Sequence, residues 1–274
     1  MRRWFWLALC LWGCAPAPEK SATPQVSHTP KPVPVIASRA PAEWTLIFYF
    51  AADNDLEDAE LSDLEELTRI ELEAKPEQKV RILALMDRSP LGKRSEGYSN
   101  RAVANQANWN GAKLLEVTQD KLTEIDDWGK LNMADPQTLK RLVLLAQDKY
   151  PAQRYALFLV DHGKAWAGLC SDNSASRPDD TLDLKELGQA LEGLEKPLEL
   201  LAFDACMMGS LEVYLALAPS TRTMIASQDT LPGEGLEYHR ALSPLLARPQ
   251  MSGRELGSSF LEAYRQSMVD DPEE

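Results

Sequence analysis

Two short segments of this chain place a reactive side chain directly after a run of apolar residues. Residues 155–160 precede His162, and residues 198–203 precede Cys206 by a short interval. Apolar runs of this length are typical of buried parallel strands, and open α/β sheets place their active sites at the C-terminal ends of such strands. An imidazole beside a thiol can take its proton and so activate it as a nucleophile. The two segments therefore predict a cysteine hydrolase.

Each residue on its own supports a structural interpretation. A single cysteine behind an apolar strand is usually a small buried hydrophobe. A single histidine is more often hydrogen-bonded into the structure than catalytic. The matched placement of His162 and Cys206, each after a predicted strand, favours catalysis.

These segments closely resemble motifs of the clostripain-like cysteine peptidases, which are relatives of the caspases, legumains and gingipains. The strongest likeness lies in Asp161-His162-Gly163 and in residues 203–208, Phe-Asp-Ala-Cys-Met-Met. Further stretches match in the same order, namely residues 44–57, 182–187 and 225–229, followed by Pro232-Gly233 and Tyr238. The resemblance covers roughly residues 44–240.

The resemblance implies the catalytic roles. Cys206 would attack the scissile carbonyl to form an acyl-enzyme, and His162 would act as acid and base. The backbone N–H groups of Gly163 and Cys206 would form the oxyanion hole. Glycine fits that role, because a residue without Cβ lets the substrate approach the backbone closely.

Asp204 is the candidate for substrate selection. It lies two residues before Cys206, so both side chains are expected on one face of the strand. The matching acid in the family lines the pocket for the side chain before the cut, which implies cleavage after Arg or Lys. Asp229, with Ser227, is expected to flank the same pocket. Alternatively, Asp204 caps a helix that starts near residue 207.

Strand and helix patterns alternate along the chain. Short apolar runs predict strands over 44–50, 80–86, 155–160, 198–203 and 223–227. Amphipathic patterns predict helices over 55–73, 136–149, 183–194, 208–217 and 253–269, the second with Asp135 as its N-cap before Pro136. This alternation predicts an α/β fold with a mainly parallel sheet and helices on both faces. The family resemblance implies the same three-layer α/β/α sandwich, caspase-like in type.

The N-terminus has the pattern of an export signal. Arg2 and Arg3 precede an apolar stretch over residues 4–13 that is too short to span a bilayer. Leu11-Trp12-Gly13-Cys14 resembles a bacterial lipoprotein cleavage box, which implies lipidation of Cys14 after removal of residues 1–13. The competing interpretation is an ordinary secretory signal.

The segment after the predicted signal is expected to tether the domain to a membrane. Residues 14–43 are rich in proline and small polar residues, a composition that favours extended conformations and cannot bury a core. We therefore expect export to the cell envelope with a lipid anchor, in the outer membrane if the host has one.

Composition bounds the remaining possibilities. The chain is 44% hydrophobic and 26% charged with a net charge of −13, so no basic surface is available for nucleic acid. Residues 44–274 have the length of one α/β domain. Family members often continue further, so this domain is expected to be either a compact version or C-terminally short. We expect a monomer whose partner is a peptide or protein substrate.

The cysteines, histidines and acidic residues raise the questions of a disulfide and of a metal site. Cys170 and Cys206 could form a disulfide in an exported protein, although this would consume the proposed nucleophile. A zinc site is not indicated, because His162 and His239 are the histidines of the domain and no Cys-x-x-Cys occurs. The acidic stretch 53–58 lacks the spacing of an EF-hand. We therefore predict no metal site and no cofactor, with calcium left open because some family members need it.

Two alternatives to a peptidase remain open, together with a prediction on processing. The chain could be a catalytically silent surface lipoprotein that uses this fold as a binding module. It could also be a binding or adhesion lipoprotein of unrelated fold.

Self-cleavage at Arg177 is not expected, because Pro178 follows it and lacks the N–H of an ordinary peptide bond.

Overall fold

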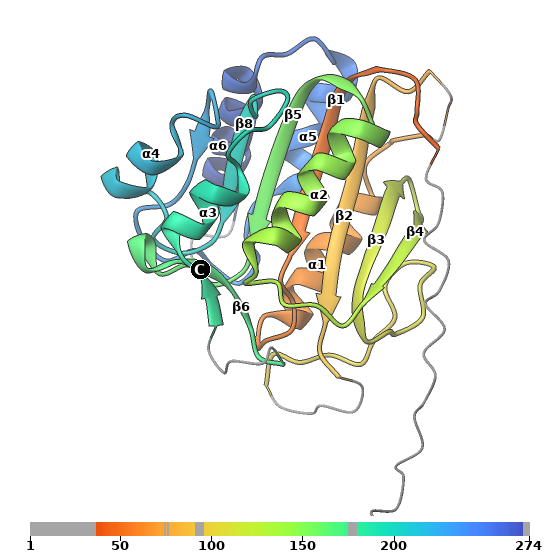
Figure 1. The fold of residues 1–274 in the computed structure, drawn as a ribbon. Helices are drawn as coiled ribbons and strands as arrows, with labels where there is room; N and C mark the ends of the chain where they lie inside the picture. Colours follow the sequence, from red (N-terminus) through yellow and green to blue (C-terminus); the bar gives the residue numbers. More distant parts are fainter. Residues whose placement is uncertain (1–36, 74, 76, 91–95, 175–179, 271–274) are drawn as a thin grey trace, which may run out of the picture. The chain divides into compact units, whose positions relative to one another are not determined.

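Seven strands form one sheet (Figure 1). The structure, a computed structural model, describes residues 37–73, 75, 77–90, 96–174 and 180–270. Cys14 and the site at Arg177 lie outside these residues, so their predictions stay untested. The strands of the sheet are β1 (Ala42–Phe50), β2 (Val80–Arg88), β3 (Gly111–Thr118), β4 (Lys121–Gly129), β5 (Ala152–Val160), β8 (Leu200–Asp204) and β9 (Met224–Ile225).

The sheet is parallel through its centre and antiparallel at one side. Its strand order is β4-β3-β2-β1-β5-β8-β9. The strands from β2 to β9 in this order pair in parallel, whereas β3 pairs antiparallel with β2 and with β4. A separate two-stranded hairpin consists of β6 (Leu169–Asp172) and β7 (Asp180–Leu182).

Helices cover both faces of the sheet. One face packs against α2 (Pro136–Lys149), α3 (Leu184–Ala190) and α4 (Leu211–Leu217), and the other against α1 (Glu57–Thr68), α5 (Tyr238–Ala247) and α6 (Gly253–Asp270). Each strand supplies alternate residues to the two cores: Phe48 belongs to the core under α1, α5 and α6, and Tyr49 to the core under α2, α3 and α4. The predicted three-layer α/β/α fold with a mainly parallel sheet is confirmed.

Local sequence explains where the helices of the first face begin. The Asp135 side chain accepts a 2.8 Å hydrogen bond from Gln137 N, and Pro136 occupies the first turn, as predicted. Asp183 and Glu186 form a reciprocal capping box at α3. These caps fix the helix starts without tertiary contacts.

Several boundaries differ from the sequence-based prediction. The helix predicted from residue 55 to 73 ends at Thr68, and the helix predicted from 208 begins only at Leu211. The strands β3, β4, β6 and β7 and the helix α5 were not predicted. The exposed side of β4 carries charged and polar residues, so its hydrophobic period is broken. In α5 the buried residues Tyr238, Ala241, Leu242 and Leu245 do follow a helical period, but the helix is short and contains Pro244, which usually interrupts a helix. Among the described residues, no helix is long and apolar enough to cross a membrane.

Candidate active site

The two catalytic candidates leave the sheet side by side. In the parallel pair β5–β8, Val160 lies opposite Asp204, and Asp161 N donates a 3.2 Å hydrogen bond to the Asp204 carbonyl. The segments that follow β5 and β8 therefore leave the sheet at the same edge. His162 and Cys206 line one cavity of about 260 Å³ at this edge. The structure thus places the thiol and the imidazole at the ends of two adjacent parallel strands, as the sequence predicted.

Backbone contacts hold the loop that carries Cys206. The thiol is half-buried, and its sulfur accepts a 3.3 Å hydrogen bond from Leu231 N. Met207 adopts a left-handed conformation, with a φ of 61°, and its N–H donates to the Asp229 carbonyl at 3.0 Å. A non-glycine residue in this region carries strain that its surroundings must offset. The sharp turn after Cys206 keeps the sulfur at the cavity wall.

A carboxylate orients the imidazole. His162 Nε2 lies 2.9 Å from Asp55 Oδ1 at the end of the loop that follows β1. A carboxylate only accepts, so Nε2 carries the hydrogen, and in the neutral ring Nδ1 is free to accept a proton. The side chains of His162 and Asp55 are 39% and 63% exposed, so the pair lies at the rim of the site.

Asp161 anchors the histidine segment from beneath. Its carboxylate accepts from Asn54 Nδ2 at 2.8 Å and from the Ser171 N–H. Burial raises the pKa of Asp161 to about 7, although these hydrogen bonds favour the ionised form. The hydrogen bonds join the loop after β1, the end of β5 and the strand β6 immediately behind His162.

Gly163 is required by the contact between the loop that carries His162 and the loop that carries Cys206. A Cβ atom at this position would lie 2.1 Å from the carbonyl oxygen of Cys206. Any larger residue would push the loop after β5 away from the loop after β8. The close approach places the backbone of Gly163 beside Cys206, where the predicted oxyanion hole would lie.

Asp204 forms part of a buried acidic wall of the cavity. Its Oδ2 accepts from Leu236 N at 2.9 Å and from the Tyr238 hydroxyl at 2.5 Å. The hypothesis that Asp204 caps the next helix is wrong. That helix starts at Leu211, and the Asp204 carboxylate accepts instead from Leu236 and Tyr238. Leu236, just before α5, and Tyr238, the first residue of α5, therefore fix the position of the Asp204 carboxylate.

Two further carboxylates line the same cavity. Glu60 and Asp63, one turn apart on α1, are 2% and 6% exposed, and Asp204 is 6% exposed. Burial raises the pKa of Asp204, and burial with repulsion from neighbouring carboxylates raises the pKa values of Glu60 and Asp63 well above their ordinary value. Both Glu60 carboxylate oxygens lack a hydrogen-bond partner among the described residues. The cavity thus has an acidic wall, and none of the described residues that line it is a Lys or an Arg.

Ser227 and Asp229 lie beside the nucleophile loop but outside this cavity lining. The Ser227 carbonyl accepts from Gly209 N at 2.6 Å, and the Asp229 carbonyl accepts from Met207 N. Their side chains make local bonds: Asp229 N donates to Ser227 Oγ at 3.1 Å, and Thr230 N donates to Asp229 Oδ1 at 2.8 Å. The structure brings both residues to the site through their backbone.

The cysteines of the domain do not form the alternative disulfide. Cys170 is a buried free thiol on β6, and Cys206 is a half-buried free thiol. Burial raises the pKa of Cys170 well above its ordinary value, which keeps this thiol protonated and unreactive. Cys206 is therefore the candidate nucleophile.

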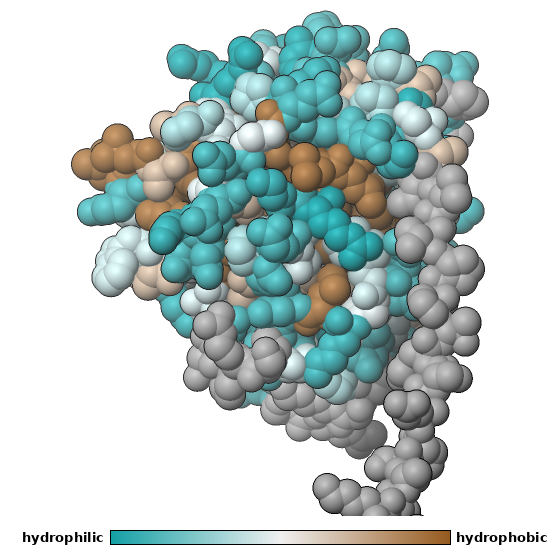
Figure 2. Space-filling view, in the orientation of Figure 1, coloured by the Kyte–Doolittle hydropathy of each residue, from teal (hydrophilic) through white to brown (hydrophobic). Residues whose placement is uncertain are grey.

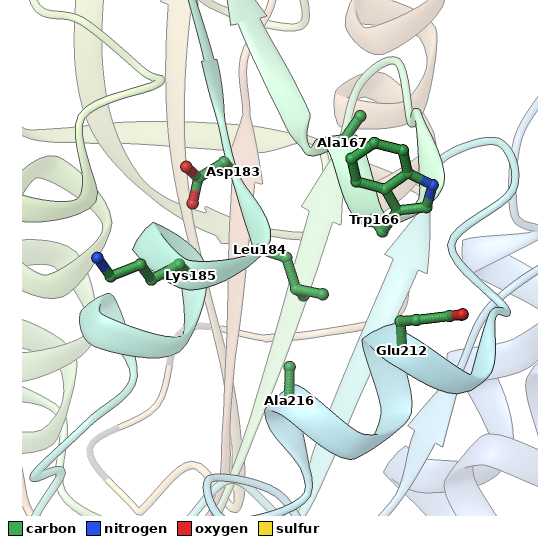
Figure 3. A pocket seen from close by; sticks show the side chains of 7 residues that line it. All are labelled: Trp166, Ala167, Asp183, Leu184, Lys185, Glu212 and Ala216. Carbon is green, nitrogen blue, oxygen red and sulfur yellow. The ribbon is translucent and has the colours of Figure 1, made fainter.

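A larger hollow of about 810 Å³ lies between η1 (Ala165–Ala167), α3 and α4. Figure 3 shows Trp166 across this hollow from Leu184 and Ala216. Trp166 is 68% exposed, and apolar side chains also gather over α4 (Figure 2), where Leu211 and Leu215 are each 67% exposed. Neither His162 nor Cys206 lines this hollow, so it is not the candidate active site, although it is larger than the cavity that these two residues line.

Sequence reasoning missed four contributors to the site. Asp55 precedes α1 and Glu60 lies in its first turn, where charge is explained equally well by the helix dipole, and Asp63 lies about one turn further along the helix. The Leu231 N–H is a backbone group in a loop and has no sequence signal. The position of α1 after β1, the strand next to β5, was the available clue for the three acids.

This fold and site define a caspase-like α/β protein with the residues of a cysteine peptidase. The chain belongs to the clostripain family, Peptidase C11, whose model matches residues 48–274. It is 26% identical over 230 residues to clostripain of Hathewaya histolytica, an alignment that covers 74% of this chain and 42% of clostripain.

Solved structures share the fold. A secreted C11 cysteine protease from Bacteroides thetaiotaomicron, in complex with an irreversible peptide inhibitor, matches with a TM-score of 0.66 at 22% identity, over 84% of this chain and 59% of that one. An inactive zymogen C11 protease from Parabacteroides distasonis matches with a TM-score of 0.60 at 21% identity, over 83% and 60%. The chain thus spans less than two thirds of the length of each of these relatives.

Proposed function

We propose that this chain is an exported cysteine endopeptidase that cleaves peptide bonds after Arg or Lys. The observation that carries the proposal is one cavity lined by a thiol, an imidazole and a set of buried carboxylates. Membership of the clostripain family supports the reaction class. The acidic wall supports the choice of a basic side chain.

The reaction would use the two strand-end residues in sequence. His162 takes the Cys206 proton, and the sulfur attacks the scissile carbonyl carbon to give a tetrahedral oxyanion. N–H groups of Gly163 and Cys206 stabilise this oxyanion. The C–N bond then breaks, and His162 protonates the leaving amine. Water, deprotonated by His162, hydrolyses the thioester and regenerates the thiol.

Asp55 would act on this cycle through the histidine. By accepting from Nε2, it leaves Nδ1 of the neutral ring unprotonated and able to accept a proton, and it stabilises the imidazolium that forms after proton transfer. Solvent weakens a pair this exposed, so Asp55 is a positioning residue rather than a requirement for chemistry.

The choice of substrate follows from the buried carboxyl groups of the wall. Burial raises their pKa values and so favours their protonated forms before substrate binds, whereas an entering guanidinium or ammonium would favour the ionised forms and pair with them. Glu60 is the best candidate for direct contact, because its oxygens have no hydrogen-bond partner among the described residues, whereas Asp204 is already held by Tyr238. A neutral side chain would gain no ion pair with the wall.

We also propose that the chain is exported and lipid-anchored at Cys14. The signal-like N-terminus and the lipobox-like residues 11–14 support this proposal. The relative from Bacteroides thetaiotaomicron is a secreted protein, which agrees with export. Metabolic labelling with a tagged fatty acid, compared between the wild type and Cys14→Ser, tests the anchor: label on the variant would contradict it.

The test of the peptidase uses fluorogenic peptides that end in Arg, Lys, Asp or Asn before the reporter. We expect turnover after Arg or Lys and none with Cys206→Ala. Glu60→Gln should lower kcat/KM for the Arg peptide roughly 10- to 100-fold, as expected for loss of a charge-assisted contact. Glu65→Gln is the matched control, because this α1 side chain is 41% exposed and pairs with Arg101 outside the cavity.

The outcomes separate the competing functions. Cys206-dependent cleavage after Asp or Asn would support the proposed mechanism but would reject the proposal that the acidic wall selects Arg or Lys. No cleavage of any peptide by a folded wild-type chain, with and without added calcium, would reject the peptidase and favour a silent binding module.

A further inference from the structure

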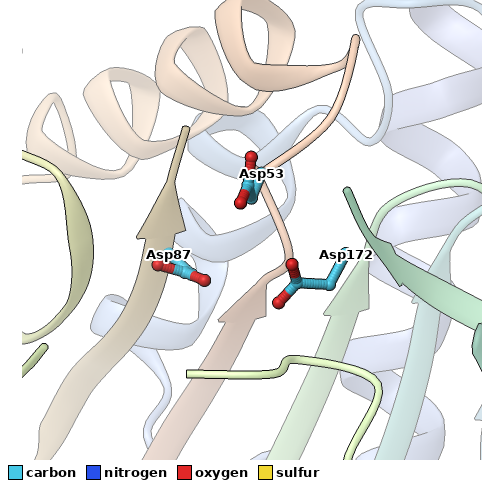
Figure 4. Close-up of side chains that lie close together, drawn as sticks. All are labelled: Asp53, Asp87 and Asp172. Atoms are coloured by element: carbon cyan, nitrogen blue, oxygen red, sulfur yellow. The ribbon is translucent and has the colours of Figure 1, made fainter. Parts of the chain in front are cut away.

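Three aspartates from separate segments meet in the interior behind the catalytic edge. Asp53 lies in the loop after β1, Asp87 lies on β2 and Asp172 ends β6 (Figure 4). One carboxylate oxygen from each lies within 4.8 Å of the others, and the residues are 1%, 1% and 0% exposed. Neighbouring strand ends therefore enclose a compact group of oxygens away from solvent.

The cluster contains carboxylate oxygens that no protein donor satisfies. Asp53 Oδ2 and Asp87 Oδ1 are buried and lack a hydrogen-bond partner among the described residues. The other Asp53 oxygen accepts from Ser89 Oγ at 2.8 Å, and Asp172 accepts from Met133 N at 2.9 Å. These bonds orient the side chains and leave two free oxygens in the cluster.

Two of the three aspartates have no basic partner to balance their charge. Within the described part of the chain, no Lys, Arg or His forms an ion pair with Asp53 or Asp87. The charge of Lys130 lowers the pKa of Asp87, but the two side chains form no ion pair. Buried carboxylates in native proteins are normally paired or bind a metal.

We propose that Asp53, Asp87 and Asp172 bind a calcium ion. The ligands are all oxygen, which selects a hard cation over zinc or copper. Calcium accepts six to eight oxygens in irregular geometry, including bidentate carboxylates. Magnesium needs octahedral geometry and keeps several waters, which a site this closed to solvent accommodates poorly. The ion supplies positive charge only and takes no part in bond making.

The ion would act on the segments that hold His162. Asp53 immediately precedes Asn54, which donates to Asp161 Oδ1 at 2.8 Å and to the Ser171 carbonyl at 3.3 Å. Asp172 immediately follows Ser171. Calcium would thus tie the loop after β1 to β6 and fix the support beneath the catalytic histidine.

The acidic stretch 53–58 contributes one residue to this cluster, Asp53. Asp55 bonds His162, and Asp58 is exposed and pairs with Arg101 at 3.1 Å. The ligand set comes from three segments that are distant in sequence. This explains why the linear spacing of the stretch resembles no calcium loop.

The test uses the full chain in a Cys206→Ala background, so that self-digestion and the proposed peptidase activity do not affect it. After EDTA treatment and desalting, calcium chloride is titrated calorimetrically, and thermal unfolding is followed with and without calcium. We expect one calcium per chain and a Tm rise of about 5–10 °C at a hundredfold excess over Kd. Magnesium should give a smaller shift at the same concentration.

Asp87→Asn and Asp53→Asn each keep side-chain volume and should lower calcium affinity at least about tenfold. Asp58→Asn, from the same acidic stretch but outside the cluster, should bind as the parent does. Absence of both heat and Tm shift in the Cys206→Ala chain would overturn the proposal, whether or not the ligand variants fold. Equal calcium binding by Asp53→Asn, Asp58→Asn and the parent would overturn it too, as would a preference for magnesium.

Discussion

The Tyr238 hydroxyl donates a 2.5 Å hydrogen bond to Asp204 Oδ2, joining the start of α5 to the C-terminal end of β8. The tyrosine ring is fully buried and packs edge-on against Phe48, with centroids 5.3 Å apart, and against Phe158. Aromatic packing of this kind restricts the ring, so the hydroxyl is fixed relative to the sheet. The core of the domain thereby sets the position of a carboxylate in the acidic wall.

Replacing Tyr238 by Phe isolates this hydrogen bond. The ring and its packing remain, but Asp204 Oδ2 keeps only the Leu236 N–H as a described donor. Loss of a bond to a charged group should lower the free energy of unfolding by about 1.5–3 kcal/mol. Urea unfolding of the Tyr238→Phe and wild-type proteins at neutral pH measures this difference. An unchanged midpoint would mean that the bond makes no net contribution.

Asp55→Asn tests the orienting contact on His162. The pair is well exposed, so its free energy should be about 0.2–1 kcal/mol, which corresponds to at most roughly a fivefold fall in kcat. KM should stay constant, because Asp55 does not line the acidic cavity. Steady-state kinetics across a pH series separates the two constants. A loss of a thousandfold would show that Asp55 is needed as strongly as a buried triad acid.

Gly163→Ala and Gly188→Ala should have opposite effects on stability. At position 163 the new Cβ would meet the Cys206 carbonyl at 2.1 Å, so we expect lower Tm and loss of peptide hydrolysis. In α3, a Cβ atom added to Gly188 would meet no atom within 4 Å beyond its chain neighbours and the backbone of its own helix, so alanine should stabilise the helix by about 0.5–1 kcal/mol. Thermal unfolding of the two variants beside the wild type measures both signs. Equal Tm values would refute the steric explanation.

Asp161 predicts that stability falls as pH rises. Burial raises its pKa to about 7, so between its ordinary value and about pH 7 the native protein binds more protons than the unfolded chain. The stabilising protonated form is complete below about pH 4 and is lost as pH rises through 7. Each pKa unit corresponds to about 1.4 kcal/mol.

Asp161→Asn should flatten this dependence, because an amide does not titrate. Urea unfolding at about pH 4, 6 and 8 compares it with the wild type and with Asp148→Asn, whose side chain is 69% exposed. The wild type and the control should lose stability over this range more steeply than Asp161→Asn. Parallel curves for all three proteins would contradict the assignment to Asp161.

Local sequence was sufficient for the elements that carry His162 and Cys206. The apolar runs before His162 and Cys206 are buried on both faces of the sheet, which makes them recognisable without tertiary information. The Asp135-Pro136 cap was also readable, because its hydrogen bond spans two residues. By contrast, β4 is half-exposed and its hydrophobic pattern is broken, so its pairing with β3 could not be inferred.

The sequence by itself determined the α/β class, the two strand-end residues and the acid two positions before the thiol, because these depend on short-range hydrophobic pattern and motif. Only the tertiary structure decided which other groups meet them. Glu60 and Asp63 enter the cavity because α1 borders it together with the end of β8, and Asp53, Asp87 and Asp172 meet because three separate segments end together. Such contacts depend on strand order and helix packing, and spacing along the chain does not encode these distances.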